Sequence, residues 1–231
     1  MSKYLNNDTI SIASTRQKVI QLFFAVIGVF ITVFGIVMFN RYLLMELSLG
    51  LRMVLMIISQ WSIMIVPLLV IKANKENISD YFRTKERLVK QVRTGLLLGL
   101  AMSLFLTIVP ILLGLKDMVG TSSYTKPWQF IYEFIYMIFG VALAEEFVFR
   151  GYIFHKLLEI KDSRWFAILV SSLLFGLLHI FNGDLIQVFV TGLLGVLFCT
   201  FREKIKGCSL LSLIIAHGLH NGLITLWVTY L

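Results

Sequence analysis

The chain of 231 residues has little charge, little proline and almost no cysteine. Only 15% of its residues are charged, whereas 58% are hydrophobic; soluble domains carry roughly 25% charged residues. Three prolines and the lack of a Ser- or Gly-rich stretch exclude collagen-like, mucin-like and disordered architectures. Two cysteines are too few for a disulfide scaffold. A chain this apolar cannot hide its hydrophobic surface in one water-facing globule, so we expect a membrane protein.

Seven apolar runs approach the roughly 20 residues that a helix needs to cross a bilayer. These runs are 19–40, 53–71, 95–115, 130–154, 165–181, 185–201 and 209–231. The expected fold class is therefore all-α, a polytopic membrane helix bundle of about seven transmembrane helices. Residues 1–18 would form a cytoplasmic N-terminal arm, 19–128 the first three helices, and 129–231 a core of helices four to seven.

Lys and Arg are unevenly distributed among the loops that join these runs. If the N-terminus is cytoplasmic, all but four of the 21 basic residues fall on the inner side. The positive-inside rule therefore predicts a multi-pass protein of the cell membrane with a cytoplasmic N-terminus and an extracytoplasmic C-terminus. The net charge of +8 then reflects this topology against an anionic leaflet, and no nucleic-acid partner is expected.

Polar and charged side chains stand inside three of the expected spans. They are Glu145, Glu146, Arg150, His179, His217, His220 and Asn221. A charged side chain at mid-membrane costs about 2.5 to 3.5 kcal/mol on insertion scales, so such residues indicate a functional site. With a helical rise of 1.5 Å per residue, Glu145 lies about 16 Å, His179 about 22 Å and Asn221 about 21 Å above the expected inner boundary. Similar depths on three helices predict one site in the middle of the membrane.

A carboxylate, two imidazoles and an amide around one point suit hydrolysis by an activated water. The carboxylate and one imidazole can hold a water and take its proton. The amide and the second imidazole can form an oxyanion hole. No activated Ser or Cys is needed, and the lack of an HExxH sequence gives no support to a thermolysin-like zinc site.

Other polar and small residues have structural interpretations. Glu146 and Arg150 stand four residues apart on one helix face, which favours an internal salt bridge; alternatively, Arg150 snorkels to the inner surface. Serines in membrane helices commonly bond back to their own backbone, and this is expected of Ser171, Ser172 and Ser212. A GxxxG pair at 95 and 99 can bring one helix close to a neighbour.

Three groups of residues in this chain resemble the motifs of one protein family. Glu145-Glu146-Phe-Val-Phe-Arg150 resembles an EExxxR motif and Phe175-Gly-Leu-Leu-His179 an FxxxH motif. His217-Gly-Leu-His-Asn221 resembles an HxxxN motif. The three motifs, in this order on three membrane helices, are those of the CPBP family, which includes CAAX proteases and bacteriocin-processing enzymes and is also called Abi. The resemblance covers residue 130 to the C-terminus and identifies 129–231 as a CPBP/Abi-like protease core.

This resemblance implies an intramembrane endopeptidase. Glu145 would be the catalytic carboxylate, and His179 would help it to hold and activate water. His217 and Asn221 would stabilise the oxyanion, while His220 lies outside the motif and would be a packing or cavity-lining residue. The residues supporting this site would be Glu146, Arg150 and Phe175.

The resemblance leaves the cofactor open. Members of the family are described both as metalloproteases and as metal-independent glutamate proteases. Glu145, His179 and His217 could hold one zinc ion with an open fourth position. Alternatively, the site works without any cofactor, which is the interpretation that we favour.

The expected partner is a membrane-associated peptide or protein in the lipid bilayer. Processing of a bacteriocin, pheromone or leader peptide, or self-immunity, would be the biological role on family grounds. The alternative is a non-enzymatic bacteriocin-immunity or scaffold protein that retains the site residues. A transporter is disfavoured because the sequence has no internal repeat and no pair of Gly- or Pro-broken helices. The sequence indicates no oligomeric state.

Overall fold

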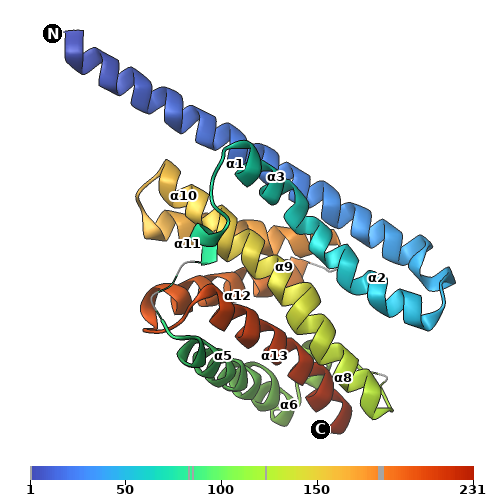
Figure 1. The fold of residues 1–231 in the computed structure, drawn as a ribbon. Coiled ribbons are helices and arrows are strands. Elements are labelled where there is room, and N and C mark those ends of the chain that lie inside the picture. The colour runs from blue at the N-terminus through green and yellow to red at the C-terminus, as the bar shows by residue number, and fades with distance from the viewer. Residues whose placement is uncertain (1, 83, 85, 123, 182–184) are drawn as a thin grey trace. The chain divides into compact units, whose positions relative to one another are not determined.

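The computed structural model describes residues 2–82, 84, 86–122, 124–181 and 185–231, with side chains from Thr15 onward. Every regular element in these ranges is helical and none is a strand, which confirms the all-α prediction (Figure 1). The α-helices are α1 (Ser2–Tyr42), α2 (Leu49–Trp61), α3 (Ile65–Ala73), α4 (Ser79–Phe82), α5 (Leu88–Ser103), α6 (Val109–Leu112), α7 (Lys116–Val119), α8 (Pro127–Ile135), α9 (Leu143–Glu146), α10 (Phe154–Ile160), α11 (Arg164–Leu178), α12 (Leu185–Lys204) and α13 (Leu210–Tyr230).

Six shorter helical segments connect or interrupt these helices. Three are 3₁₀ turns: η1 (Leu44–Glu46), η2 (Ser62–Met64) and η6 (His179–Phe181). Three are π-helical: η3 (Leu104–Ile108), η4 (Tyr136–Ala142) and η5 (Phe147–Ile153). Two of the π-helical segments lie in the helical stretch that runs without a break from Pro127 to Ile160.

Six helical stretches are long and apolar enough to cross a membrane. They are Thr15–Glu46, Leu49–Ala73, Leu88–Leu112, Arg164–Phe181, Leu185–Lys204 and Leu210–Tyr230. Each coincides with one of the expected spans. The expected span 130–154 is helical but is not among the six, because it carries four charged residues. The count by length and apolarity is therefore six rather than seven, and a crossing by 130–154 stays a prediction.

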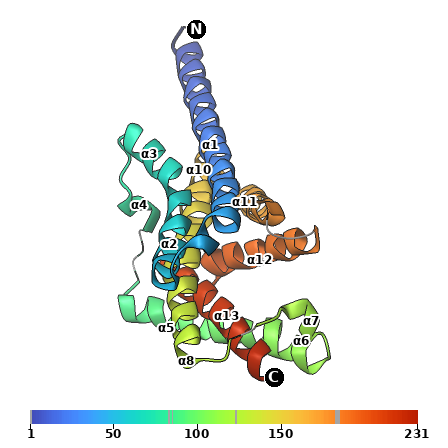
Figure 2. The same cartoon turned by 90° about the vertical axis from the view of Figure 1, so that its right-hand side faces the viewer.

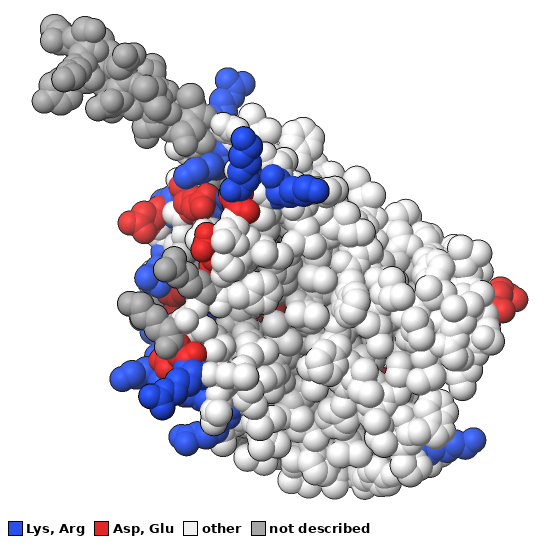
Figure 3. Space-filling view, in the orientation of Figure 1, with Lys and Arg blue, Asp and Glu red and all other residues white. Residues whose placement is uncertain are grey.

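Large apolar side chains are exposed along these stretches. Phe23, Phe24, Phe105 and Phe189 each leave 59% to 67% of their surface uncovered. Most of the surface visible in Figure 3 carries no charged side chain. Contiguous apolar surface of this extent marks an interface with lipid or protein, so the helices indicate a multi-pass membrane protein.

Contacts between residues divide the chain into two compact units, each built from segments that are distant in sequence. The first unit comprises residues 1–43, 62–81 and 147–200, and the second comprises 44–61, 82–146 and 201–231. The division passes between residues 146 and 147, inside the EExxxR motif. The second unit therefore holds Glu145, Glu146, His217, His220 and Asn221, while the first holds the remaining expected site residues.

In the first unit, α1 contacts α3 and α10, and α10 contacts α11. A buried ion network fixes the start of the loop after α3, because Lys156 of α10 donates to Glu76 at 2.6 Å and to Glu159 at 3.1 Å. The Lys156 side chain is only 2% exposed. Its two carboxylate partners explain how a buried ammonium group is tolerated.

In the second unit, α13 lies beside α5 (Figures 1 and 2) and also contacts α8 and η4. A Cβ atom added at Gly95 of α5 would lie 2.7 Å from the Ser212 carbonyl oxygen, and one at Gly99 would lie 3.0 Å from that of Ala216. On the other side, a Cβ at Gly218 of α13 would lie 2.5 Å from the Ile138 Cα atom. The GxxxG pair thus packs α5 closely against α13, as expected, and α13 touches backbone on both sides.

Candidate active site

Helix α13 carries three polar side chains of the candidate site. His217 is 6% exposed and His220 is 3% exposed, while Asn221 is half-buried. His217 and Asn221 stand four residues apart on a regular α-helix, so they share one face. The backbone contacts of α13 with α5 and η4 hold this face in a fixed direction.

His217 is joined to Glu146 of α9 by a short hydrogen bond. The distance from His217 Nδ1 to Glu146 Oε1 is 2.8 Å, and the two side chains are 7% and 0% exposed. A carboxylate only accepts hydrogen bonds, so we assign a proton to Nδ1 of His217. The bond fixes the orientation of the ring and directs Nε2 away from Glu146.

The other ring nitrogen of His217 faces Glu145. Nε2 lies 3.9 Å from Glu145 Oε2, and the Glu145 side chain is 11% exposed. This distance is too long for a direct hydrogen bond, but it suits two groups that address one small molecule or group between them. The two glutamates of the motif therefore contact opposite nitrogens of one imidazole, which is the core of the candidate site.

The two glutamates stand on a short α-helical segment, α9, between two π-helical ones. Segment η4 ends at Ala142 and η5 begins at Phe147. Such π-helical turns occur frequently at functional sites. The expected i, i+4 relationship of Glu146 and Arg150 assumed a regular α-helix, and this assumption is wrong because η5 is π-helical. The salt bridge between Glu146 and Arg150 stays a prediction.

In the first unit, Arg150, Phe175 and His179 lie together. The Arg150 guanidinium carbon stands 4.0 Å from the centre of the Phe175 ring, and the Phe175 and His179 rings meet edge to face with centroids 5.0 Å apart. His179 Nδ1 lies 2.9 Å from the Phe175 carbonyl oxygen. This bond leaves Nε2 of His179 available for chemistry.

Ser171 and Ser212 have other hydrogen-bond partners than the sequence predicts. Ser171 donates to the Phe149 carbonyl oxygen at 2.8 Å and Ser212 donates to that of Gln91 at 2.8 Å, so both hydroxyls donate to other helices, while Ser212 Oγ also accepts from the Ser209 backbone nitrogen at the cap of its own helix. His220 is buried as expected, but its Nδ1 atom has no hydrogen-bond partner among the described residues. Tertiary packing decides the acceptors of Ser171 and Ser212, and the sequence carries no signal for them.

Glu133 is a further buried carboxylate in the same helical stretch as the glutamate pair. It is 7% exposed and accepts hydrogen bonds from the hydroxyls of Tyr124 at 3.0 Å and Thr225 at 3.3 Å. These two hydroxyls give Glu133 a structural role beside α13, where Thr225 stands one helical turn after Asn221.

The donor chemistry of the expected zinc ligands is suitable, but their grouping is not. His217 and His179 each engage Nδ1 in a hydrogen bond to an oxygen, as histidines in many zinc sites do. In the parts of the chain that the structure describes, however, no three His, Cys, Asp or Glu side chains are grouped as a metal ion would need. We therefore derive no step of the reaction through a metal.

The comparisons with known proteins agree with the motifs. Residues 127–223 match the family described as Type II CAAX prenyl endopeptidase Rce1-like, and this range contains all three motifs. The comparisons with curated proteins and with solved structures give no match. The resemblance to CPBP proteases is thus confirmed for the C-terminal part of the chain, and the family implies a protease that acts on a peptide or protein. Residues 127–223 form a domain of the Rce1-like type II CAAX prenyl endopeptidase family, the CPBP/Abi family.

Proposed function

We propose that this protein is an intramembrane endopeptidase that cleaves a membrane-associated peptide or protein with a water activated by Glu145. The observation that carries the proposal is the arrangement of two buried glutamates around His217, one 2.8 Å from Nδ1 and the other 3.9 Å from Nε2. An imidazole with a purely structural role would need only one carboxylate partner, whereas His217 has two glutamates beside it. The family match adds the reaction class.

The proposed reaction begins with a water bound to the Glu145 carboxylate. The water oxygen attacks the carbonyl carbon of the scissile peptide bond, and Glu145 takes the proton. The resulting tetrahedral intermediate collapses as the carbon–nitrogen bond breaks, and Glu145 returns the proton to the leaving amine. The products are a carboxylic acid and an amine, which become a carboxylate and an ammonium group when the acid's proton moves to the amine, so both hydrogens of the water are accounted for.

His217 and Asn221 are proposed to stabilise the negative oxygen of the intermediate. When both ring nitrogens of His217 carry hydrogen, Nδ1–H donates to Glu146 and Nε2–H to the oxyanion. Asn221 follows one turn later on the same face of α13 and offers its amide hydrogens to the same oxygen. Because Nε2 is 3.9 Å from Glu145, the water and the carbonyl oxygen would bind side by side.

His179, Phe175 and Arg150 complete the proposal on the evidence of the motifs alone. His179 would help Glu145 to hold the water through its available Nε2 atom. Phe175 would orient His179, to which it offers its carbonyl oxygen at 2.9 Å. Arg150 would support Phe175, whose ring it covers.

The proposed substrate is a peptide embedded in or bound to the membrane, because the glutamates and His217 are buried among apolar helices. The family's name refers to prenyl endopeptidases. A bacteriocin, pheromone or leader peptide is the substrate class that we propose for this chain, with self-immunity as a related role.

The proposal is tested by comparing the membrane peptides of cells that carry the wild type, Glu145→Gln or Glu133→Gln. Glu145→Gln keeps the shape of the side chain but cannot take the proton, so an uncleaved peptide should accumulate. Glu133→Gln is the matched control, a buried glutamate outside the three motifs: the amide oxygen still accepts from one of the two hydroxyls, and the other hydroxyl can turn to accept from the amide nitrogen. Identical peptides in wild-type and Glu145→Gln cells, at equal protein levels, would favour a non-enzymatic immunity or scaffold role.

A further inference from the structure

We infer that Gln91 of α5 is a positioning residue for the candidate site. It fixes the first turn of α13 and thereby the direction in which His217 and Asn221 point. The inference rests on the proposed function of these two residues, but Gln91 lies outside residues 127–223 and outside the three motifs.

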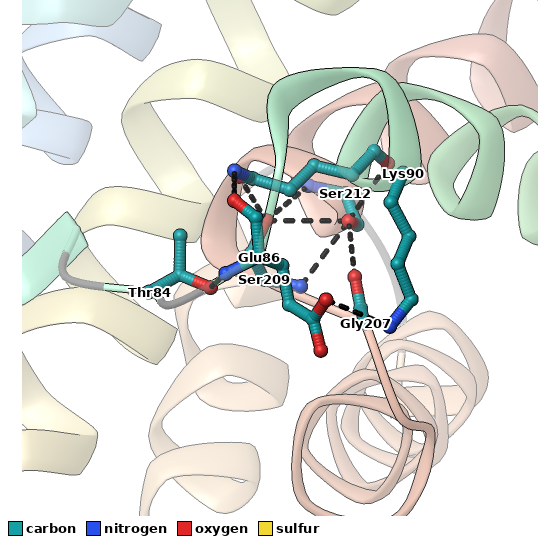
Figure 4. Close-up of polar contacts among 7 residues, drawn as sticks. Thr84, Glu86, Lys90, Gly207, Ser209 and Ser212 are labelled. Atoms are coloured by element: carbon teal, nitrogen blue, oxygen red, sulfur yellow. Dashed lines mark hydrogen bonds and ion pairs between the residues drawn. The ribbon is translucent and has the colours of Figure 1, made fainter.

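Both the side chain and the backbone of Gln91 bind the start of α13. Ser209 Oγ donates to Gln91 Oε1 at 2.6 Å, and Ser212 Oγ donates to the Gln91 carbonyl oxygen at 2.8 Å. The Gln91 amide nitrogen donates in turn to the Glu86 carbonyl oxygen at 2.8 Å. Figure 4 shows the two serines next to Glu86 and Lys90. Gln91, Ser209 and Ser212 are 9%, 5% and 0% exposed, so water does not compete for these bonds.

The same two serines cap α13. Ser209 Oγ accepts from the Ser212 backbone nitrogen at 3.2 Å, and Ser212 Oγ accepts from that of Ser209 at 3.1 Å. Each hydroxyl has one hydrogen to donate: Ser209 donates to Gln91 Oε1, and the Gln91 carbonyl oxygen is the nearer acceptor for Ser212, at 2.8 Å against 3.4 Å for the Gly207 carbonyl oxygen. The same two hydroxyls therefore form the helix cap and the hydrogen bonds to Gln91, and the first turn of α13 cannot rotate without breaking these bonds.

The link acts directly on the site because of its position along α13. After Ser212, the Ile215 side chain lies against Gly95 of α5 and the Ala216 carbonyl oxygen faces Gly99, and His217 follows immediately. Ser212 is five residues before His217, a rise of about 7.5 Å. A rotation of α13 by one residue would turn His217 by about 100°, away from both glutamates.

The chemistry of the link favours positioning over simple stabilisation. Packing by small and apolar residues would hold α5 against α13 without any polar group, as it does at Gly95 and Gly99. A buried polar group adds little net stability, but it can fix the register of packed helices. Two of the three hydrogen bonds of Gln91 reach Ser209 and Ser212 in the first turn of α13, where they oppose a change of register that would displace His217.

The inference is tested with isotope-labelled histidine in the detergent-solubilised full chain. The chain has only four histidines, so the NMR signal of His217 is identified by its loss in His217→Gln. Gln91→Met keeps the size of the side chain and removes its bond to Ser209. Ser103→Ala is the matched control, because it breaks another bond between α5 and α13, from Trp227 Nε1 at 2.8 Å.

Gln91→Met should shift the His217 signal and leave that of His155 in place, whereas Ser103→Ala should leave both in place. Ser209→Ala should reproduce the shift, and Ser209→Thr, which keeps the hydroxyl, should restore the wild-type signal. An unmoved His217 signal in Gln91→Met and Ser209→Ala, or an equal shift in Ser103→Ala, would overturn the inference.

The activity assay separates this inference from the proposed function. With the peptide that accumulates in Glu145→Gln cells, Gln91→Met should lower kcat about 10- to 100-fold at nearly constant KM, because misplacement of about 1 Å has such effects. Unchanged kcat would count against positioning. If no peptide accumulates, the proposed function fails, while the NMR signal of His217 still decides the role of Gln91.

Discussion

Glu146 Oε1 and His217 Nδ1 are 2.8 Å apart although 71 positions separate the two residues in the chain. The contact joins the EExxxR motif to the HxxxN motif inside the second unit. It gives the second glutamate of the pair a partner of its own and leaves the first glutamate facing Nε2 of the same ring.

Glu146→Gln should lower turnover about 10- to 100-fold, the usual cost of changing a residue that orients a functional histidine. The amide oxygen still accepts from Nδ1, so the fold is retained, but a charge-assisted hydrogen bond that holds the ring is replaced by a weaker neutral one. Turnover and the melting temperature measured on the same preparation check this. A Glu146→Gln variant with wild-type turnover would limit the contact to a structural role.

Asn221→Ala should slow turnover by about 10²- to 10³-fold, as for the loss of one oxyanion donor, while KM changes little. Asn221→Asp should be at least as harmful, because a carboxylate repels the developing negative charge. Single-turnover kinetics of both variants provide the measurement. Normal rates in both would reduce Asn221 to a residue of helix packing.

Gly218→Ala should destabilise the protein by about 1 to 3 kcal/mol, the usual cost of overpacking. The new methyl group would meet the Ile138 Cα atom at 2.5 Å, and backbone cannot move aside as a side chain can. Gly35→Ala is the control, since no atom lies within 4 Å of its added Cβ. In a thermal unfolding experiment, Gly35→Ala should leave the stability unchanged or raise it slightly. An equal loss of stability in both variants would contradict the packing argument.

The purified enzyme should contain no stoichiometric zinc and should remain active after treatment with a strong chelator. A catalytic zinc takes three protein ligands, whereas the proposed mechanism needs only the Glu145 carboxylate as the base. Metal analysis beside activity assays checks the expectation. Loss of activity on chelation, restored by zinc and accompanied by loss of bound zinc in His179→Ala, would establish the metalloprotease alternative.

The topology depends on whether the polar stretch Pro127–Ile160 crosses the membrane. We expect that it does, because its charged side chains Glu145, Glu146 and Arg150 are buried within protein. A reporter fused after Leu231 should then signal an extracytoplasmic C-terminus. A cytoplasmic signal would leave six crossings, the number given by apolarity alone.

The helices were predictable because lipid imposes one simple requirement, about 20 apolar residues in a row. The expected ends were nevertheless wrong where a helix continues past the apolar run. Helix α5 begins at Leu88 and not at Gly95, because Lys90, Gln91 and Arg93 stay helical at its polar end. The segment 130–154 is less apolar than the other expected spans, because its charged side chains are surrounded by protein and not by lipid.

The motifs identified the polar residues but not their contacts. Helical periodicity assigns residues to faces only on a regular α-helix, and the π-helical segments η4 and η5 break that rule on both sides of Glu145 and Glu146. The bond from Glu146 to His217, and the bonds from Ser209 and Ser212 to Gln91, join residues that are far apart in the chain. No local pattern specifies such partners, so these contacts required the three-dimensional structure.

The close approach of α13 to backbone on both sides limits how a substrate can enter. A helix in contact with α5 through Gly95 and with η4 through Gly218 cannot swing alone without opening both contacts, because packed interfaces do not deform continuously. We therefore expect α5, η4 and α13 to stay together if the protein opens to admit a peptide, so that a hinge would lie outside these segments.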